Sequence, residues 1–152
     1  MKPIDIKVKK LSDTACLPVK KYETDYCYDL TADSVEEIAP NVYKYSVNLA
    51  FQIDRQSCPE LEDYLLDIDA RPRSSIYKTG MILANCVPTI DENYTGNVQM
   101  IFYHVFPNMP KYEVGDRICQ IKLGFTPKHI FTEVEELSTT DRGNGGFGST
   151  GR

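Results

Sequence analysis

The sequence lacks the marks of a zinc-binding, exported or membrane protein. It has only two histidines and an odd number of cysteines, five, with no Cys-x-x-Cys pair among them. This usage is typical of reduced thiols in a cytosolic protein and supplies no ligand set for a tightly held zinc ion. No apolar run approaches the ~20 residues that a membrane-spanning helix needs, and residues 1–5 carry no hydrophobic signal region. We therefore expect a protein of the cytoplasm (or of the nucleus or a host cytoplasm, if the source is eukaryotic or viral) with no membrane partner.

Basic residues are also few. Lys and Arg number 17 against 22 Asp and Glu, which gives a formal net charge of −5. Such a chain is a poor partner for a nucleic-acid backbone or an anionic membrane surface. It can still bind a polyphosphate, but only through a local cluster of Arg and Lys, usually helped by a divalent cation. The length of 152 residues is enough for one domain with a real core.

What the sequence does contain is short segments of alternating polarity. Ile4, Ile6 and Val8 alternate with charged residues, and residues 43–53 give the clearest case, with Tyr, Val, Leu, Phe or Ile at every odd position. Further strands are predicted at residues 80–84, 98–105, 117–125 and 130–137, with Pro and Gly between them. Many short strands without alternating long helices predict an all-β sandwich, jelly roll or barrel.

One short helix is expected at residues 57–66. Ser57 and Glu60 have the spacing of a capping box, and Pro59 lies in the first turn. Leu61, Tyr64 and Leu65 would then share a helical face. The sequence therefore predicts two to three helical turns that cover one end of a sheet.

Residues 85–97 form a polar connection between two apolar segments and predict a hairpin that lies over a pocket. Asp91 follows Ile90 at the end of a predicted strand, where a carboxylate can activate a water molecule. Tyr94 offers a flat ring against which a sugar could rest. Taken alone, this segment is more typical of an ordinary hairpin with a solvated Asp.

The tail, residues 142–152, contains five glycines in eleven residues. Its composition is typical of a flexible Gly/Ser tail, but its backbone N–H groups, two hydroxyls and an Arg could also cradle phosphates. It is not a Walker A loop, because no Lys precedes the Ser149-Thr150 pair. Phe147 favours a lid, since a large aromatic side chain could stack on a planar base.

Five motifs, taken together and in this order, resemble the deoxyuridine triphosphatase (dUTPase) family. They extend over nearly the whole chain, and the last is the most specific. They are Tyr28-Asp29-Leu30-Thr31-Ala32, Pro72-Arg73-Ser74-Ser75, Ile90-Asp91-x-x-Tyr94-x-Gly96, Gly115-Asp116-Arg117-Ile118-x-Gln120 and Arg142-Gly143-x-Gly145-Gly146-Phe147-Gly148-Ser149-Thr150-Gly151.

The resemblance implies a role for each matching residue. Asp91 would be the general base, and Tyr94 would pack under the deoxyribose and exclude a 2′-hydroxyl. Asp29 would lie near a Mg²⁺ ion and act on it indirectly, through water, while the substrate phosphates mainly hold the ion. The other substrate-binding residues fall into a uracil-reading set (Asn85, Thr89, Ile90 and Gln99), a phosphate-holding set (Arg73, Ser74, Ser75 and Gln120) and a lid (Arg142, Phe147, Gly148, Ser149 and Thr150).

The family fold implied is a jelly-roll-like β domain, here residues 1–141, followed by a phosphate-binding lid, residues 142–152. The implied reaction is Mg²⁺-dependent hydrolysis of dUTP to dUMP and pyrophosphate, which limits uracil incorporation into DNA and supplies dUMP for dTMP synthesis. The implied assembly is a homotrimer with shared active sites. Cys27 and Pro88 stand where the family usually has Gly, so the rim of the uracil pocket is expected to differ.

Two alternatives remain at this point. A dCTP deaminase-like enzyme would need a carboxylate on the strand after the hairpin, and residues 97–105 contain no Asp or Glu. A non-catalytic or moonlighting module for nucleotide sensing or protein interaction would be indicated by loss of the base or the lid. Asp91, Tyr94 and Phe147 are all present, so both alternatives rank below hydrolysis.

Overall fold

The computed structural model describes residues 3–146 and is built almost entirely of strands, which confirms the predicted all-β class. Three short 3₁₀ helices are the only helical elements among these residues, and none of them has the length or apolar character needed to cross a membrane. The elements are β1 (Ile6–Lys10), β2 (Tyr28–Thr31), β3 (Ser34–Ala39), β4 (Val42–Ser46), β5 (Leu49–Ile53), η1 (Arg55–Ser57), η2 (Pro59–Leu61), β6 (Tyr64–Pro72), η3 (Ser74–Lys78), β7 (Met81–Leu83), β8 (Thr89–Asp91), β9 (Gln99–His104) and β10 (Arg117–Pro127).

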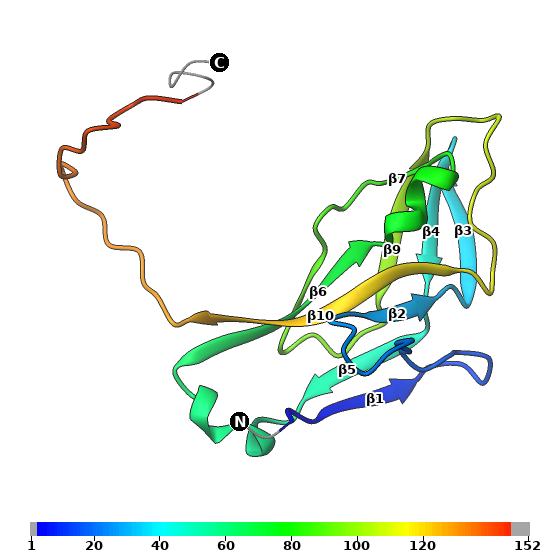
Figure 1. Cartoon of the computed structure of the whole chain (residues 1–152), viewed down its shortest axis with the longest axis horizontal. Coiled ribbons are helices and arrows are strands. Elements are labelled where there is room, and N and C mark those ends of the chain that lie inside the picture. The colour runs from blue at the N-terminus through cyan, green and yellow to red at the C-terminus, as the bar shows by residue number, and fades with distance from the viewer. Residues whose placement is uncertain (1–2, 147–152) are drawn as a thin grey trace.

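The strands form three antiparallel groups around one core (Figure 1). One four-stranded sheet has the order β2-β10-β6-β8, and the other has the order β3-β4-β9-β7. β1 and β5 form a two-stranded ribbon below them in the view of Figure 1. This arrangement fits the jelly-roll-like fold expected from the sequence.

The alternation over residues 43–53 is confirmed, but it belongs to two strands. Every odd residue of the segment is buried, from Tyr43 to Ile53. Asn48 lies between β4 and β5 with a positive φ of 51°, a conformation that Asn tolerates better than most residues. The chain turns there, so that β4 joins the sheet with β9 while β5 pairs with β1. The buried residues of this one segment therefore reach the core from two different strand groups.

The prediction of a helix at residues 57–66 is wrong. The segment holds two short 3₁₀ turns, η1 and η2, and its last residues begin β6. Ser57 does not cap a helix, because its hydroxyl donates to the carbonyl of Asp54 and accepts from the backbone N–H of Asp5. β6 pairs with β10 over nine positions, and this tertiary pairing outweighs a weak local preference for helix.

The strand predicted at residues 130–137 is also wrong for the isolated chain. Residues 128–146, which we call the C-terminal arm, follow β10 with no strand among them and extend away from the body (Figure 1). Ile130 is 88% exposed and Phe131 is 95% exposed. A strand needs a hydrogen-bonding neighbour, and the body of the same chain provides none for this segment.

Candidate active site

The predicted hairpin around Asp91 is confirmed. β7 and β9 pair antiparallel, with Met81 opposite His104 and Leu83 opposite Phe102. The side chain of Asn85 fixes the start of the connecting loop, since its Oδ1 accepts from the backbone N–H of Ile101 at 3.1 Å. The loop itself crosses to the other sheet, where it contributes β8.

β8 is an edge strand, and this position exposes Asp91. Its register with β6 places Ile90 opposite Ile68 and Asp91 opposite Asp67. Ile90 packs against the core, so the carboxylate of Asp91, on the alternate face, points outward. The approach to β8 is joined to β6 at Pro88, whose carbonyl accepts from the backbone N–H of Ala70 at 2.9 Å.

The edge position also leaves one side of the β8 backbone available. β6 pairs with one side only, and β8 ends the sheet order among residues 3–146. An edge strand presents free N–H and C=O groups, which are the groups needed to read the edge of a planar base. The hydroxyl of Thr89, by contrast, is engaged with Asp69 Oδ1 at 3.2 Å.

Tyr94 is held beside Asp91 by the turn that follows β8. Its backbone N–H donates to the carbonyl of Asp91 at 2.9 Å, and its hydroxyl donates to the carbonyl of Asn97 at 2.9 Å. A Cβ on Gly96 would lie 2.6 Å from atoms of the Tyr94 ring, so Gly96 is what allows the ring to fold back over the turn. The ring remains 47% exposed and can act as a platform.

The outer face of the β10-β6-β8 sheet carries several carboxylates besides Asp91. Burial, together with the nearby charge of Asp69, raises the pKa of Asp67 above its usual range. Burial opposes ionisation of Asp69 as well, but hydrogen bonds from Lys122 and Thr89 hold the pKa of Asp69 below its ordinary value. This face is therefore negative around Asp91, and an anionic substrate needs cations to approach it.

A basic cluster lies farther along the same sheet. Arg73 Nε donates to Asp29 Oδ1 at 2.9 Å, and Arg117 Nη1 donates to Asp29 Oδ2 at 3.0 Å. Gln120 stands directly opposite Asp29 in the β2-β10 pairing. These residues, with Ser74, Lys20 and Lys21, line a surface hollow of about 460 Å³. Ser75 lies beside it, with its hydroxyl 3.5 Å from Arg73 Nη1.

The cluster also shows which acid Arg117 pairs with. It pairs with Asp29 and not with its neighbour Asp116, whose Oδ2 accepts from the backbone N–H of Glu113. Asp29 is bound by two guanidinium groups. It orients Arg73 and Arg117 toward the hollow and offers few free lone pairs to a cation.

The residues present do not form a protein-only metal site. Within residues 3–146 no three His, Cys, Asp or Glu side chains are grouped closely enough to hold an ion. A Mg²⁺ ion at the hollow would therefore take most of its ligands from phosphate oxygens and water, as Mg²⁺ commonly does.

One chain does not bring all the predicted residues together. Across the sheet, Asp91 is level with Gly124 of β10, because both pair with Asp67 of β6. Gln120 lies four residues from Gly124 along β10, which corresponds to about 13 Å. Gln99 Nε2 donates to Ser46 Oγ at 3.0 Å, on the other sheet. Arg142 lies on the C-terminal arm and donates to the carbonyl of Gly145. Phe147, Gly148, Ser149 and Thr150 lie outside the described residues.

Sequence reasoning missed two groups at the site. Lys20 and Lys21 line the basic hollow, and their adjacency in an acidic chain was the available signal. Arg55 and Glu92 form an ion pair beside Asp91, and nothing in their spacing of 37 residues could have paired them.

Comparisons with known proteins agree on one family. The sequence model of the dUTPase family matches residues 13–151. A deoxyuridine 5′-triphosphate nucleotidohydrolase of Helicobacter pylori is 35% identical over 147 residues, 96% of each chain, and one of Clostridium acetobutylicum is 36% identical over 149 residues, 97% of each chain. The dUTPase of Staphylococcus bacteriophage 80alpha has the same fold, with a TM-score of 0.78 over 97% of this chain and 99% of its own at 23% identity. The chain belongs to the dUTPase family.

Proposed function

We propose that this chain hydrolyses dUTP at the α-phosphorus to give dUMP and pyrophosphate. The observation that carries the proposal is the arrangement of β8, where an exposed carboxylate, a free backbone edge and the ring of Tyr94 lie within one turn. The names of the Helicobacter and Clostridium relatives state the same activity for those proteins. In a cell, the reaction limits uracil incorporation into DNA and supplies dUMP for dTMP synthesis. All five cysteines are free thiols, and we assign the reaction to the cytoplasm.

Asp91 acts as the general base. It orients a water molecule toward the α-phosphorus and accepts its proton as the P–O bond to pyrophosphate breaks. The uracil edge pairs with the backbone around Ile90, assisted by Asn85, Thr89 and Gln99. Tyr94 packs under the deoxyribose and leaves no space for a 2′-hydroxyl.

The basic cluster holds the triphosphate. Arg73, with its guanidinium oriented by Asp29, supplies fixed positive charge where charge accumulates on the departing pyrophosphate. Ser74, Ser75 and Gln120 add neutral donors around the same hollow. Arg142 and the residues 147–150 close over the outer phosphates as a lid on the β domain, and Phe147 stacks on the base.

Mg²⁺ is the cofactor we propose. When bound, it offsets the charge of the phosphates, which the acidic face around Asp91 would otherwise repel. Asp29 reaches it only through water, because both of its carboxylate oxygens already accept hydrogen bonds from Arg73 and Arg117. A related phage phi11 dUTPase is described with a structural Mg(II) ion.

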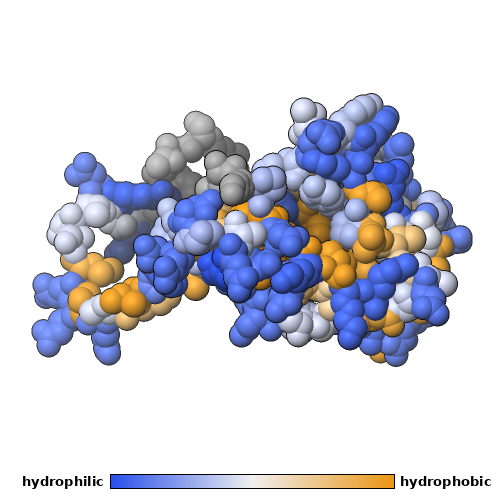
Figure 2. All heavy atoms as spheres, turned by 90° about the horizontal axis from the view of Figure 1, so that it is seen from below, coloured by the Kyte–Doolittle hydropathy of each residue, from blue (hydrophilic) through white to orange (hydrophobic). Residues whose placement is uncertain are grey.

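We further propose a homotrimer with shared active sites. Asp91 and the Arg73 cluster are too far apart on one chain to reach a single α-phosphate and its leaving group, so a neighbouring copy must supply one of them. The C-terminal arm and an open apolar groove of about 900 Å³ are surfaces through which one copy could contact another. The groove is lined by β1 side chains together with Phe51, Ile68 and Ile121, and Figure 2 shows hydrophobic surface on both the body and the arm.

The test is pyrophosphate release measured in parallel with dUTP, UTP, dTTP and dCTP, with and without Mg²⁺. We expect Mg²⁺-dependent turnover of dUTP far above the other three. Ammonia release from dCTP would instead support the deaminase alternative. Tight nucleotide binding without any turnover would support the non-catalytic alternative.

A further inference from the structure

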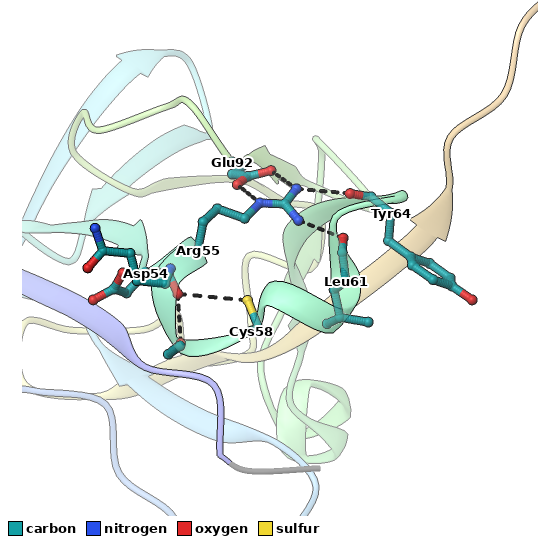
Figure 3. A network of polar contacts seen from close by, with 8 residues as sticks. Asp54, Arg55, Cys58, Leu61, Tyr64 and Glu92 are labelled. Carbon is teal, nitrogen blue, oxygen red and sulfur yellow. Dashed lines mark hydrogen bonds and ion pairs between the residues drawn. The ribbon is translucent and has the colours of Figure 1, made fainter.

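One guanidinium connects three segments next to Asp91. Arg55, in the η1 turn after β5, donates from Nε and Nη2 to the two carboxylate oxygens of Glu92. Its Nη1 donates to the carbonyl of Leu61 and its Nη2 to the carbonyl of Tyr64, each at 2.9 Å. Figure 3 shows these contacts converging on Arg55 from the hairpin on one side and from the η2–β6 connection on the other.

The hairpin needs such an anchor. β8 has only three residues and pairs with β6 alone, so backbone pairing holds it weakly. Glu92 is the residue directly after Asp91, and the Tyr94 N–H bond to the carbonyl of Asp91 lies in the same turn. A contact that fixes Glu92 therefore fixes the end of β8 and the orientation of both Asp91 and Tyr94.

The Arg55–Glu92 ion pair has the geometry and burial needed to fix the position of the turn after β8. It is bidentate and half-buried, with 35% of the Arg55 side chain and 29% of the Glu92 side chain exposed, and bidentate Arg–carboxylate pairs add directional specificity to their energy. The hydrogen bonds from Arg55 lower the pKa of Glu92 below its ordinary value despite partial burial. Glu92 is thus ionised and paired at neutral pH.

We infer that Arg55 and Glu92 are positioning residues that set the Asp91 carboxylate relative to the nucleotide. Both line the same hollow of about 940 Å³ as Asp91, and neither lines the basic hollow of Arg73. Loss of the pair should therefore impair the chemical step more than binding of the phosphates. The inference rests on the proposed role of Asp91 as the base.

The first experiment compares kcat and KM for dUTP in Arg55→Lys and Glu92→Gln. Lys keeps the charge but loses the bidentate geometry, and a misplacement of roughly 1 Å can cost about 100-fold in rate. We expect kcat to fall about 10- to 100-fold while KM changes less than about 3-fold. Lys44→Ala is the control, because Lys44, whose side chain is 30% exposed, forms an ion pair with Glu36 on the other sheet, and the kcat of this variant should remain at the wild-type value.

The second experiment separates positioning from general stabilisation. Arg55→Lys is combined with Asp91→Asn, and single-turnover rates of all four proteins are compared. If Arg55 acts through Asp91, the double variant should be no slower than Asp91→Asn alone, because residues that act as a unit are not additive. A further, multiplicative loss in the double variant would overturn the inference.

The third readout does not depend on activity. Amide hydrogen exchange over residues 89–97 should become faster in Arg55→Lys, while exchange over β4 remains at the wild-type rate. Unchanged exchange in the hairpin, or an unchanged kcat in a folded Arg55→Lys protein, would also overturn the inference. Inactivity of the wild type with dUTP would count against the proposed function, and hydrogen exchange would then decide the positioning role alone.

Discussion

At the scale of single residues, Asp91 differs from the carboxylates around it in what it contacts. Asp29 is paired with Arg73 and Arg117, and Asp69 is paired with Lys122. Asp91 forms none of the ion pairs or side-chain hydrogen bonds found in residues 3–146. A carboxylate with free lone pairs is what a general base requires, whereas the paired carboxylates hold neighbouring side chains in place.

Asp91→Asn should therefore lower turnover by orders of magnitude without abolishing binding. An amide can still hold a water molecule but cannot accept its proton, and loss of a general base typically costs about 10²- to 10⁴-fold. The measurement is kcat for dUTP together with the Kd of a non-hydrolysable analogue. Asp63→Asn, at an exposed position, is the control, and near-normal turnover in Asp91→Asn would remove that residue from the role.

The proposed role of Tyr94 can be tested through sugar selection. Tyr94→Ala should raise activity on UTP relative to dUTP, since the ring is proposed to occupy the space of a 2′-hydroxyl. Tyr94→Phe loses only the hydroxyl that donates to Asn97 and should keep the preference. An unchanged ratio of the two kcat/KM values in Tyr94→Ala would mean that discrimination lies elsewhere.

Glu92 makes a prediction about pH. Because Arg55 lowers the pKa of Glu92 from its ordinary value of 4.5, the pair stabilises the fold fully above that pH and less as the pH falls through the lower folded-state value. The melting temperature of Glu92→Gln should therefore lie below that of the wild type at pH 7, and the gap should narrow below about pH 4. A gap of constant size from pH 7 to pH 3 would contradict the pairing.

At the scale of elements, sequence patterns predicted those strands whose apolar residues alternate over a long segment. β1, β4 and β5 were found in this way, and β7, β9 and β10 were found from the strand predictions at residues 80–84, 98–105 and 117–125. β6 was missed, although Leu66, Ile68 and Ala70 alternate with charged residues, because a capping-box spacing just before it suggested a helix. The pattern of β3 gave no signal, since all six of its side chains are exposed.

Single residues of the candidate site could be proposed from the sequence in a similar way. The motifs that resemble the dUTPase family point to Asp91, Tyr94, Arg73 and Gln120, because each belongs to a local pattern of residue types. The pairing of Arg117 with Asp29, 88 residues away, was not predictable, and neither was that of Arg55 with Glu92. Such contacts depend on which strands become neighbours, and no local sequence pattern predicts the strand order β2-β10-β6-β8.

The distinction between helix and strand at β6 can be tested by two neighbouring leucines. A helix over residues 57–66 would bury Leu65, whereas the strand buries Leu66 to 3% exposure and leaves Leu65 49% exposed. Leu66→Ala should lower the free energy of unfolding by about 2–5 kcal/mol, and Leu65→Ala should cost far less. Chemical denaturation of the two variants gives the comparison, and a larger loss for Leu65→Ala would favour the helix.

At the scale of the whole molecule, the C-terminal arm is the part that one chain cannot stabilise by itself. Ile130, Phe131 and Leu137 are almost fully exposed, and burying side chains of this kind contributes about 1.5–3 kcal/mol each. An arm with such residues gains stability when it packs on another copy. The arm leads directly into the proposed lid, residues 142–152. Assembly and catalysis would therefore depend on adjoining parts of the C-terminal region.

Two truncations separate these roles. A chain ending at Asp141 keeps the apolar residues of the arm and loses only residues 142–152, so it should remain folded and trimeric with a near-normal melting temperature. Its turnover should nonetheless collapse, because the lid residues Arg142, Phe147, Ser149 and Thr150 are gone. Phe147→Ala alone should cost less, about 1–3 kcal/mol for one base–aromatic stack.

A chain ending at Pro127 loses the whole arm, and it should dissociate as well as lose activity. Light scattering coupled to size-exclusion chromatography measures the assembly, and Phe131→Asp, which places a charge at a 95% exposed position, provides the matched point variant. A charge is harmless there if the arm is solvated and disruptive if Phe131 packs on a neighbouring copy. A trimeric Phe131→Asp would show that the arm does not hold the copies together, and full activity in the chain ending at Asp141 would show that the glycines are only a linker.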